Sequence, residues 1–220
     1  MRVAIAGAGA VGRSIAEELL SNGHEVLLID KSPREIKLDE LPGAEWLLAD
    51  ACEIASLEDA GLERFHVVVA ASGDDKVNLV VSLLAKTEFG VPRVVARINL
   101  PKNEWLFTEA WGVDIAVSTP RLMSALIEEA VTPSELVPLL AFPSSNANLV
   151  SIMLDDGAPW VGVPSAAVPL PADTALVAIV RRGSVVVPSD KTSLAAGDEL
   201  LFVTTEAVEE ELSELLTGEG

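Results

Sequence analysis

The chain has 220 residues, of which 50% are hydrophobic and 22% are charged, and it is long enough to bury the core of one large domain or two modest ones. The formal net charge is −19, from 15 Lys and Arg against 34 Asp and Glu, so phosphate backbones and anionic lipid heads would repel the protein. This charge argues against a nucleic-acid-binding protein and against direct binding to a membrane surface.

We expect a cytoplasmic protein without a targeting or membrane-inserted segment. Met1 leads straight into an apolar strand and not into a signal peptide. The longest apolar runs, such as residues 67–71, have the length of a strand and are too short to form a spanning helix. A single cysteine, Cys52, allows no internal disulfide, as is usual in a reducing compartment.

The first expected strand, residues 3–6, runs into a glycine motif that is typical of nucleotide-binding proteins. Gly7, Gly9 and Gly12 form G-x-G-x-x-G where the strand gives way to an amphipathic helix. In order, they permit the tight turn, the close approach of the backbone to a pyrophosphate, and the close packing of the helix on the strand. The free N–H groups of the helix N-terminus would then face the phosphates.

Asp30 ends the second expected strand, residues 25–29, where an adenosine ribose would offer its 2′- and 3′-hydroxyls. A carboxylate there disfavours a 2′-phosphate, so NAD or an adenosine nucleotide is favoured over NADP, although the neighbouring Lys31 weakens this exclusion. A glycine turn without a ligand is the alternative. The flanking strand, the helix and the strand-end acid together favour the binding site.

Further elements alternate along the first part of the chain. We expect helices at 32–41, 53–60, 75–89, 102–111 and 119–131, and strands at 46–49, 66–71, 93–98 and 113–117. This alternation predicts an α/β fold with a doubly wound, Rossmann-like parallel sheet over residues 1–132.

Ligand loops of such a sheet lie at the C-terminal ends of its strands, and four of these ends carry suggestive residues. Besides the glycine loop and Asp30, these are Asp50-Ala51 and Ala71-Ser72-Gly73 with Asn78. Asp50 could equally cap the following helix, and helix capping is the favoured role for Asp74 and Asp75.

Residues 133–147 are expected to form a linker, with a short apolar piece at 136–141. A small α+β domain is expected over residues 148–217, with strands at 148–154, 175–181, 184–187 and 199–204 and a closing amphipathic helix at 206–216.

This domain contains no His, Cys or Tyr, and Lys191 is its one lysine. A dehydrogenase needs a general acid or base beside the nicotinamide, so we predict a nucleotide sensor without catalytic residues or a metal site, and not an enzyme.

The chain resembles the cytoplasmic regulatory subunits of Trk/Ktr-type potassium uptake systems, whose unit is called the RCK domain. In the first half the resemblance is carried by residues 1–19, LLID at 27–30, LLADA at 47–51, VVVAASGDDKVN at 67–78 and VVARIN at 94–99. In the second half it is carried by IVRRG at 179–183, the proline of VVVPSD at 185–190, and LAAGDELLFV at 194–203. It covers essentially the whole chain.

The resemblance implies a peripheral subunit on the inner face of the plasma membrane that gates a potassium channel or transporter. Such proteins bind NAD(H) or ATP/ADP in the Rossmann half, form homodimers and assemble into larger rings. The C-terminal domain of some relatives binds cyclic di-AMP, and no motif here supports or excludes that ligand. An NAD-dependent oxidoreductase is the alternative function.

Carried over by position, the resemblance assigns a nucleotide site. The phosphates would meet Gly7, Ala8, Gly9, Ala10, Val11 and Gly12; the ribose would meet Asp30 and Lys31; the adenine edge would meet Asp50 and Ala51; and the far side would be lined by Ala71, Ser72, Gly73 and Asn78. Arg97 could reach phosphate, and a salt bridge at the domain edge is its alternative role.

Two positions depart from the family pattern. Some ATP-preferring members have an arginine inside the glycine turn, where this chain has Ala10, and Arg13 is a poor geometric substitute. NAD(H) is therefore favoured over ATP or ADP. Pro120-Arg121 replaces a frequent Pro-Glu, so an intersubunit contact or cation site that depends on that acid is in doubt.

Overall fold

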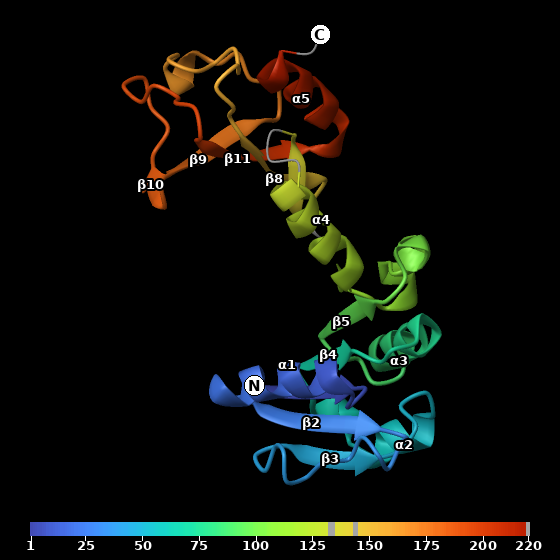
Figure 1. The fold of residues 1–220 in the computed structure, drawn as a ribbon. Helices are drawn as coiled ribbons and strands as arrows, with labels where there is room; N and C mark the ends of the chain where they lie inside the picture. The colour runs from blue at the N-terminus through green and yellow to red at the C-terminus, as the bar shows by residue number, and fades with distance from the viewer. Residues whose placement is uncertain (132–134, 143–144, 219–220) are drawn as a thin grey trace. The chain divides into compact units, whose positions relative to one another are not determined.

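The computed structural model describes residues 1–131, 135–142 and 145–218, and it divides into two compact units, Met1–Pro120 and Arg121–Gly220 (Figure 1). Each unit has its own sheet and its own hydrophobic core. We describe the two units one after the other.

The first unit contains a six-stranded, wholly parallel sheet with the strand order β3-β2-β1-β4-β5-β6. Its strands are β1 (Arg2–Ala6), β2 (Glu25–Asp30), β3 (Glu45–Leu48), β4 (Val67–Ala70), β5 (Arg93–Ile98) and β6 (Ile115–Ser118). The order reverses between β1 and β4, which is the topological switch point of a doubly wound fold. The predicted Rossmann-like architecture is confirmed.

Both faces of this sheet are covered because its central strands are continuously apolar. On one face, Val3, Ile5 and Leu28 pack with Ala16 of α1 (Ala10–Ser21). On the other face, Ala4, Leu27 and Val68 pack with the buried residues of α2 (Ile54–Asp59) and α3 (Asp75–Thr87). The strands are thereby fixed with their C-terminal ends along one edge.

Two expected helices of the first unit are not formed. Residues 32–41 form turns, in which Glu35 N donates to Ser32 O and Glu40 N donates to Lys37 O. Residues 102–111 form two 3-10 turns, η2 (Pro101–Leu106) and η3 (Glu109–Trp111), because the intervening Phe107 leaves helical geometry and is buried in the core. A further 3-10 turn, η1 (Leu62–Arg64), precedes β4.

The second unit contains a five-stranded antiparallel sheet with the order β10-β9-β11-β8-β7. Its strands are β7 (Val137–Ala141), β8 (Ala147–Met153), β9 (Ala175–Arg181), β10 (Ser184–Val186) and β11 (Glu199–Thr205). Its helical segments are η4 (Ser165–Ala167), η5 (Glu206–Val208) and α5 (Glu209–Thr217). Leu212 and Leu216 of α5 are buried with Ile152, Ile179 and Phe202 of the sheet. The predicted small α+β domain is confirmed.

The expected linker, residues 133–147, requires correction. Its apolar piece forms β7, which pairs antiparallel with β8 and so belongs to the second sheet. The pairing satisfies the backbone groups of an apolar segment that a linker would leave exposed. Residues 132–134 and 143–144 lie outside the described residues. The helix α4 (Thr119–Val131) forms as expected, with Leu126 and Ile127 exposed.

Candidate nucleotide-binding site

The three glycines of the β1–α1 loop differ in what surrounds them. Gly7 has a φ of +107°, and a Cβ at this position would lie 2.7 Å from Ser72 N. A Cβ on Gly12 would overlap the carbonyl oxygen of Gly7. Gly9 has a φ of −64°, and a Cβ there would meet nothing within 4 Å. The fold therefore requires Gly7 and Gly12, whereas the space over Gly9 is open to a ligand.

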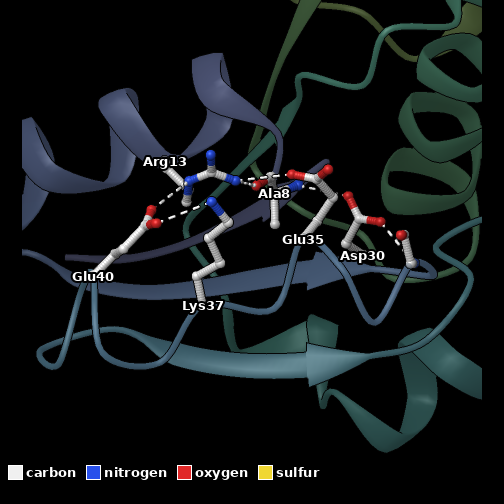
Figure 2. A network of polar contacts seen from close by, with 7 residues as sticks. Ala8, Arg13, Asp30, Glu35, Lys37 and Glu40 are labelled. Carbon is white, nitrogen blue, oxygen red and sulfur yellow. Dashed lines mark hydrogen bonds and ion pairs between the residues drawn. The ribbon is translucent and has the colours of Figure 1, made fainter.

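Asp30 stands at the C-terminal end of β2 and contacts the glycine loop directly (Figure 2). Its Oδ2 accepts a hydrogen bond from Ala8 N at 2.8 Å, and its Oδ1 accepts one from Ser32 N, also at 2.8 Å. Each oxygen keeps a further lone pair for a ribose hydroxyl. The carboxylate is thus preorganised beside the loop, as an acid for ribose recognition requires.

The loop after β4 closes the far side of the switch point. Ala71 N donates to Ala6 O at 2.8 Å, which brings this loop against the end of β1. Asn78 is fully buried in α3; its Oδ1 accepts from Ser72 N at 2.9 Å, and its Nδ2 donates to the carbonyls of Ser72 and Arg97. Its contacts therefore hold the loop in place. The predicted contact of Asn78 with the nucleotide stays a prediction.

Asp50 follows β3 and forms a turn. Cys52 N donates to Asp50 Oδ1 at 2.9 Å, and Lys31 Nζ lies 3.6 Å from Asp50 Oδ2. The backbone hydrogen bond, helped by the Lys31 charge, lowers the pKa of Asp50. Glu53 occupies the N-cap of α2, so Asp50 does not cap that helix. Its carboxylate stays ionised at the edge where an adenosine would lie.

The two acids at the start of α3 have different roles. Asp74 caps the helix as predicted, because its side chain accepts from Lys76 N at 2.9 Å. Asp75 is buried and does not cap, which corrects the sequence prediction. It accepts hydrogen bonds from Asn99 N, Asn99 Nδ2, Leu100 N and Asn103 Nδ2 at 2.7 to 3.1 Å. Asp75 thus joins α3 to the segment after β5.

Arg97 is partly buried in β5, and its Nε has no hydrogen-bond partner within the described part of the chain. The alternative salt bridge is likewise not seen among residues 1–131, 135–142 and 145–218. A buried N–H donor without a partner in the protein is able to donate a hydrogen bond to a ligand or to water. Binding of phosphate by Arg97 stays a prediction.

The predicted site residues follow or end strands at the same edge of the sheet or lie in the helix that comes next, except Arg97, which is the last but one residue of its strand. The glycine loop with Ala8, Ala10 and Val11 follows β1; Asp30 and Lys31 end β2; Asp50 and Ala51 follow β3; Ala71, Ser72 and Gly73 follow β4; Asn78 lies in α3; and Arg97 lies in β5. Sequence reasoning gave Asp75 only a capping role and set Arg13 aside as a poor substitute for an arginine in the glycine turn. Arg13 Nη1 donates to Ala8 O at 2.6 Å, a contact that no spacing rule indicates.

The fold and this edge define a Rossmann-type unit with a candidate nucleotide site, followed by a small α+β unit. The TrkA-N domain model matches residues 3–119, and the TrkA-C domain model matches residues 149–217. The "Trk system potassium uptake protein TrkA" of Mycobacterium tuberculosis is 58% identical over 216 residues, covering 98% of both chains. This chain therefore belongs to the TrkA family of Trk system potassium uptake proteins.

More distant comparisons include a further relative and solved structures with the same fold. A TrkA homolog from Methanothermobacter thermautotrophicus is 28% identical, covering 96% of this chain and 97% of its own. The solved GsuK channel has a TM-score of 0.67 at 17% identity, over 98% of this chain and 39% of its own. The GsuK channel bound to NAD has a TM-score of 0.66 at 17% identity, over 100% of this chain and 40% of its own. These structures share the fold.

Across the described residues, no helix combines the length and the apolar character that crossing a bilayer requires.

Proposed function

We propose that this protein is the cytoplasmic regulatory subunit of a Trk-type potassium uptake system and that it senses a nucleotide in its first unit. Family membership over both units and the 58% identical Trk system relative support the potassium-transport role. Binding of the nucleotide shifts a conformational equilibrium, and the shift gates a membrane transporter.

The open space over Gly9, beside the fixed carboxylate of Asp30, carries the nucleotide part of the proposal. A buried or partly buried loop glycine that the protein itself does not need is best explained by a ligand that approaches its backbone. The helix α1 begins at the next residue, so its free N–H groups face the same space.

NAD(H) is the favoured nucleotide, and ATP or ADP is the second candidate. Ala10 is exposed in the first turn of α1 and offers no cation for a third phosphate. The GsuK channel has been solved both with NAD and with ADP, so this fold accommodates either class of adenosine ligand. We propose sensing and not turnover, because, among the described residues, the ionisable side chains of Asp30, Lys31 and Asp50 belong to the proposed adenosine end of the site and are not assigned to the nicotinamide.

Isothermal titration calorimetry with NAD, NADH, ATP and ADP tests this proposal. For whichever nucleotide binds, Asp30→Ala should make the binding free energy less favourable by about 1 to 3 kcal/mol, which is the usual cost of leaving a polar group unpaired. Asp39→Ala is the matched control, because Asp39 is an exposed acid of the turn segment that follows β2. If none of the four nucleotides binds, nucleotide sensing is refuted. Steady turnover of NAD with a small substrate would instead favour an oxidoreductase.

The partner and assembly are part of the same proposal. The protein would act as a homodimer that builds a larger ring on the inner face of the membrane. Leu122, Met123, Leu126, Ile127 and Val131 of α4 are exposed, and such an apolar helix face is suited to a subunit interface. Potassium uptake by cells that lack the protein, restored by the wild-type chain and not by Asp30→Ala, would connect the nucleotide site with transport.

A further inference from the structure

We infer that Glu35 and Glu40 neutralise Arg13 and thereby make the ribose end of the site reject a 2′-phosphate, so that NAD is bound in preference to NADP. The inference rests on the proposed nucleotide binding and adds a specificity determinant to it. The groups involved are a cation beside the acid that would bind the ribose, and two carboxylates that form ion pairs with that cation.

Arg13 is held at the ribose end of the site (Figure 2). Its Nη1 donates to Ala8 O at 2.6 Å, while Ala8 N donates to Asp30 Oδ2 at 2.8 Å. The guanidinium and the Asp30 carboxylate therefore hold one residue of the glycine loop from two sides. In folds of this type an acid at the end of β2 binds the 2′-hydroxyl, whereas a nearby arginine accommodates a 2′-phosphate. This chain has both groups.

Two of the three guanidinium nitrogens of Arg13 already contact groups of the protein in this structure. Arg13 Nη1 lies 2.9 Å from Glu35 Oε2, and Arg13 Nε lies 3.2 Å from Glu40 Oε2. The Arg13 side chain is only 17% exposed. Figure 2 shows the guanidinium lying between the two carboxylates, which come from the segment that follows β2. Its Nη1 and Nε donors and its charge are thus engaged within the protein.

The surrounding charges also oppose a phosphate. Lys37 Nζ donates to Glu40 Oε1 at 2.9 Å, and this bond, with the charges of Lys37 and Arg13, lowers the pKa of Glu40. Glu40 therefore stays ionised near neutral pH. Within this network of contacts, the three carboxylates of Asp30, Glu35 and Glu40 outnumber the cations of Arg13 and Lys37. The network itself is therefore net negative and repels a 2′-phosphate, whereas Lys31, which lies 3.6 Å from Asp50, is outside it.

The alternative role for the cluster is a simple tie between α1 and residues 32–41. The two roles predict different results for nucleotide choice. If the cluster only connects α1 to residues 32–41, removing its ion pairs should change the affinities for NAD and NADP by the same factor. A specificity device should change their ratio, and the change should depend on Arg13.

Calorimetric titration of the full chain with NAD and NADP, and with AMP and adenosine 2′,5′-bisphosphate, measures that ratio, because the members of each pair differ only in the 2′-phosphate. The test variant is Glu35→Gln/Glu40→Gln, which removes two charges and keeps the shape of both side chains. Adding Arg13→Gln removes the released cation. Adding Arg34→Gln instead removes an exposed cation of the same segment and is the control. Circular dichroism establishes that each variant is folded.

We expect the Gln/Gln variant to raise the NADP-to-NAD affinity ratio about tenfold, the scale of one charge-assisted hydrogen bond. The rise should disappear with Arg13→Gln and persist with Arg34→Gln. An unchanged ratio, a rise that survives without Arg13, or a wild-type preference for NADP would overturn the inference while leaving nucleotide binding in place. Failure of the wild type to bind any of these nucleotides would instead refute the proposed function.

Discussion

At the scale of single residues, Gly12 is needed for folding, whereas Gly9 is expected to be needed for ligand binding. A Cβ on Gly12 would collide with the Gly7 carbonyl, and the backbone there cannot move without disturbing the turn. A Cβ on Gly9 would enter open space with the backbone in a conformation that any residue adopts. The two substitutions to alanine therefore form a matched pair within one loop.

We predict that Gly9→Ala leaves the free energy of unfolding within about 0.5 kcal/mol of the wild type, as is usual where a substitution meets no neighbour. The same variant should bind nucleotide at least about tenfold more weakly, because the methyl group occupies the space for the pyrophosphate. Gly12→Ala should lose about 1 to 3 kcal/mol of stability through overpacking. Urea denaturation and calorimetric titration measure the two quantities. Wild-type affinity in Gly9→Ala would contradict the placement of the phosphates.

At the scale of elements, Asp75 fastens α3 to the segment after β5. Four hydrogen bonds from Asn99, Leu100 and Asn103 converge on one buried carboxylate. The joined segments flank the loop 71–73, so the same contacts stabilise the far side of the candidate site. Asn99 Nδ2 also donates to Ser72 O at 3.0 Å, which links this network to the loop itself.

Asp75→Asn should cost about 1 to 3 kcal/mol, because an amide nitrogen replaces an acceptor and leaves buried donors unpaired. Asp74→Asn is the matched control, since asparagine caps a helix about as well as aspartate and little change is expected. Equilibrium unfolding in urea gives both values. Equal stabilities of the two variants would show that the buried network contributes nothing.

The Asp75 network also predicts a pH dependence. Burial alone would raise the pKa of Asp75, but the hydrogen bonds from Asn99, Asn103 and Leu100 outweigh burial and lower the pKa below its ordinary value of 3.8. A carboxyl with a lowered folded-state pKa stabilises the fold fully above the unfolded pKa and loses that contribution as the pH falls through the folded value. The stability difference between wild type and Asp75→Asn should thus be constant above about pH 5 and shrink below about pH 4. Urea titrations across this range test the sign.

At the scale of the whole molecule, the exposed apolar face of α4 bears on assembly. Leu126 is 61% exposed on this helix, and Leu38, in the β2–β3 segment, is exposed to the same fraction. If α4 forms the subunit interface, Leu126→Glu should shift the protein toward a smaller species in analytical ultracentrifugation, because a charge cannot be buried there without a partner. Leu38→Glu should leave the oligomer unchanged. Equal behaviour of the two variants would exclude α4 as the interface.

The sequence by itself determined the features that depend on local patterns. Continuous apolar runs and the glycine motif predicted the parallel strands, the β1–α1 turn and the position of Asp30, because neighbours in the chain control these features. The same local reasoning failed at 102–111, where the burial of Phe107 outweighs helix propensity. It also failed at 137–141, where pairing with β8 makes a strand of an expected linker.

Only the tertiary structure decided which polar groups meet. Arg13 reaches Glu35 across 22 positions of sequence, and Asp75 reaches Asn103 across 28. No periodicity relates residues so far apart, since their contact depends on how strands and helices pack into a sheet with a shared edge. The sequence therefore indicated a nucleotide site and its acid. The fold revealed Arg13 beside that acid and the two carboxylates that form ion pairs with Arg13.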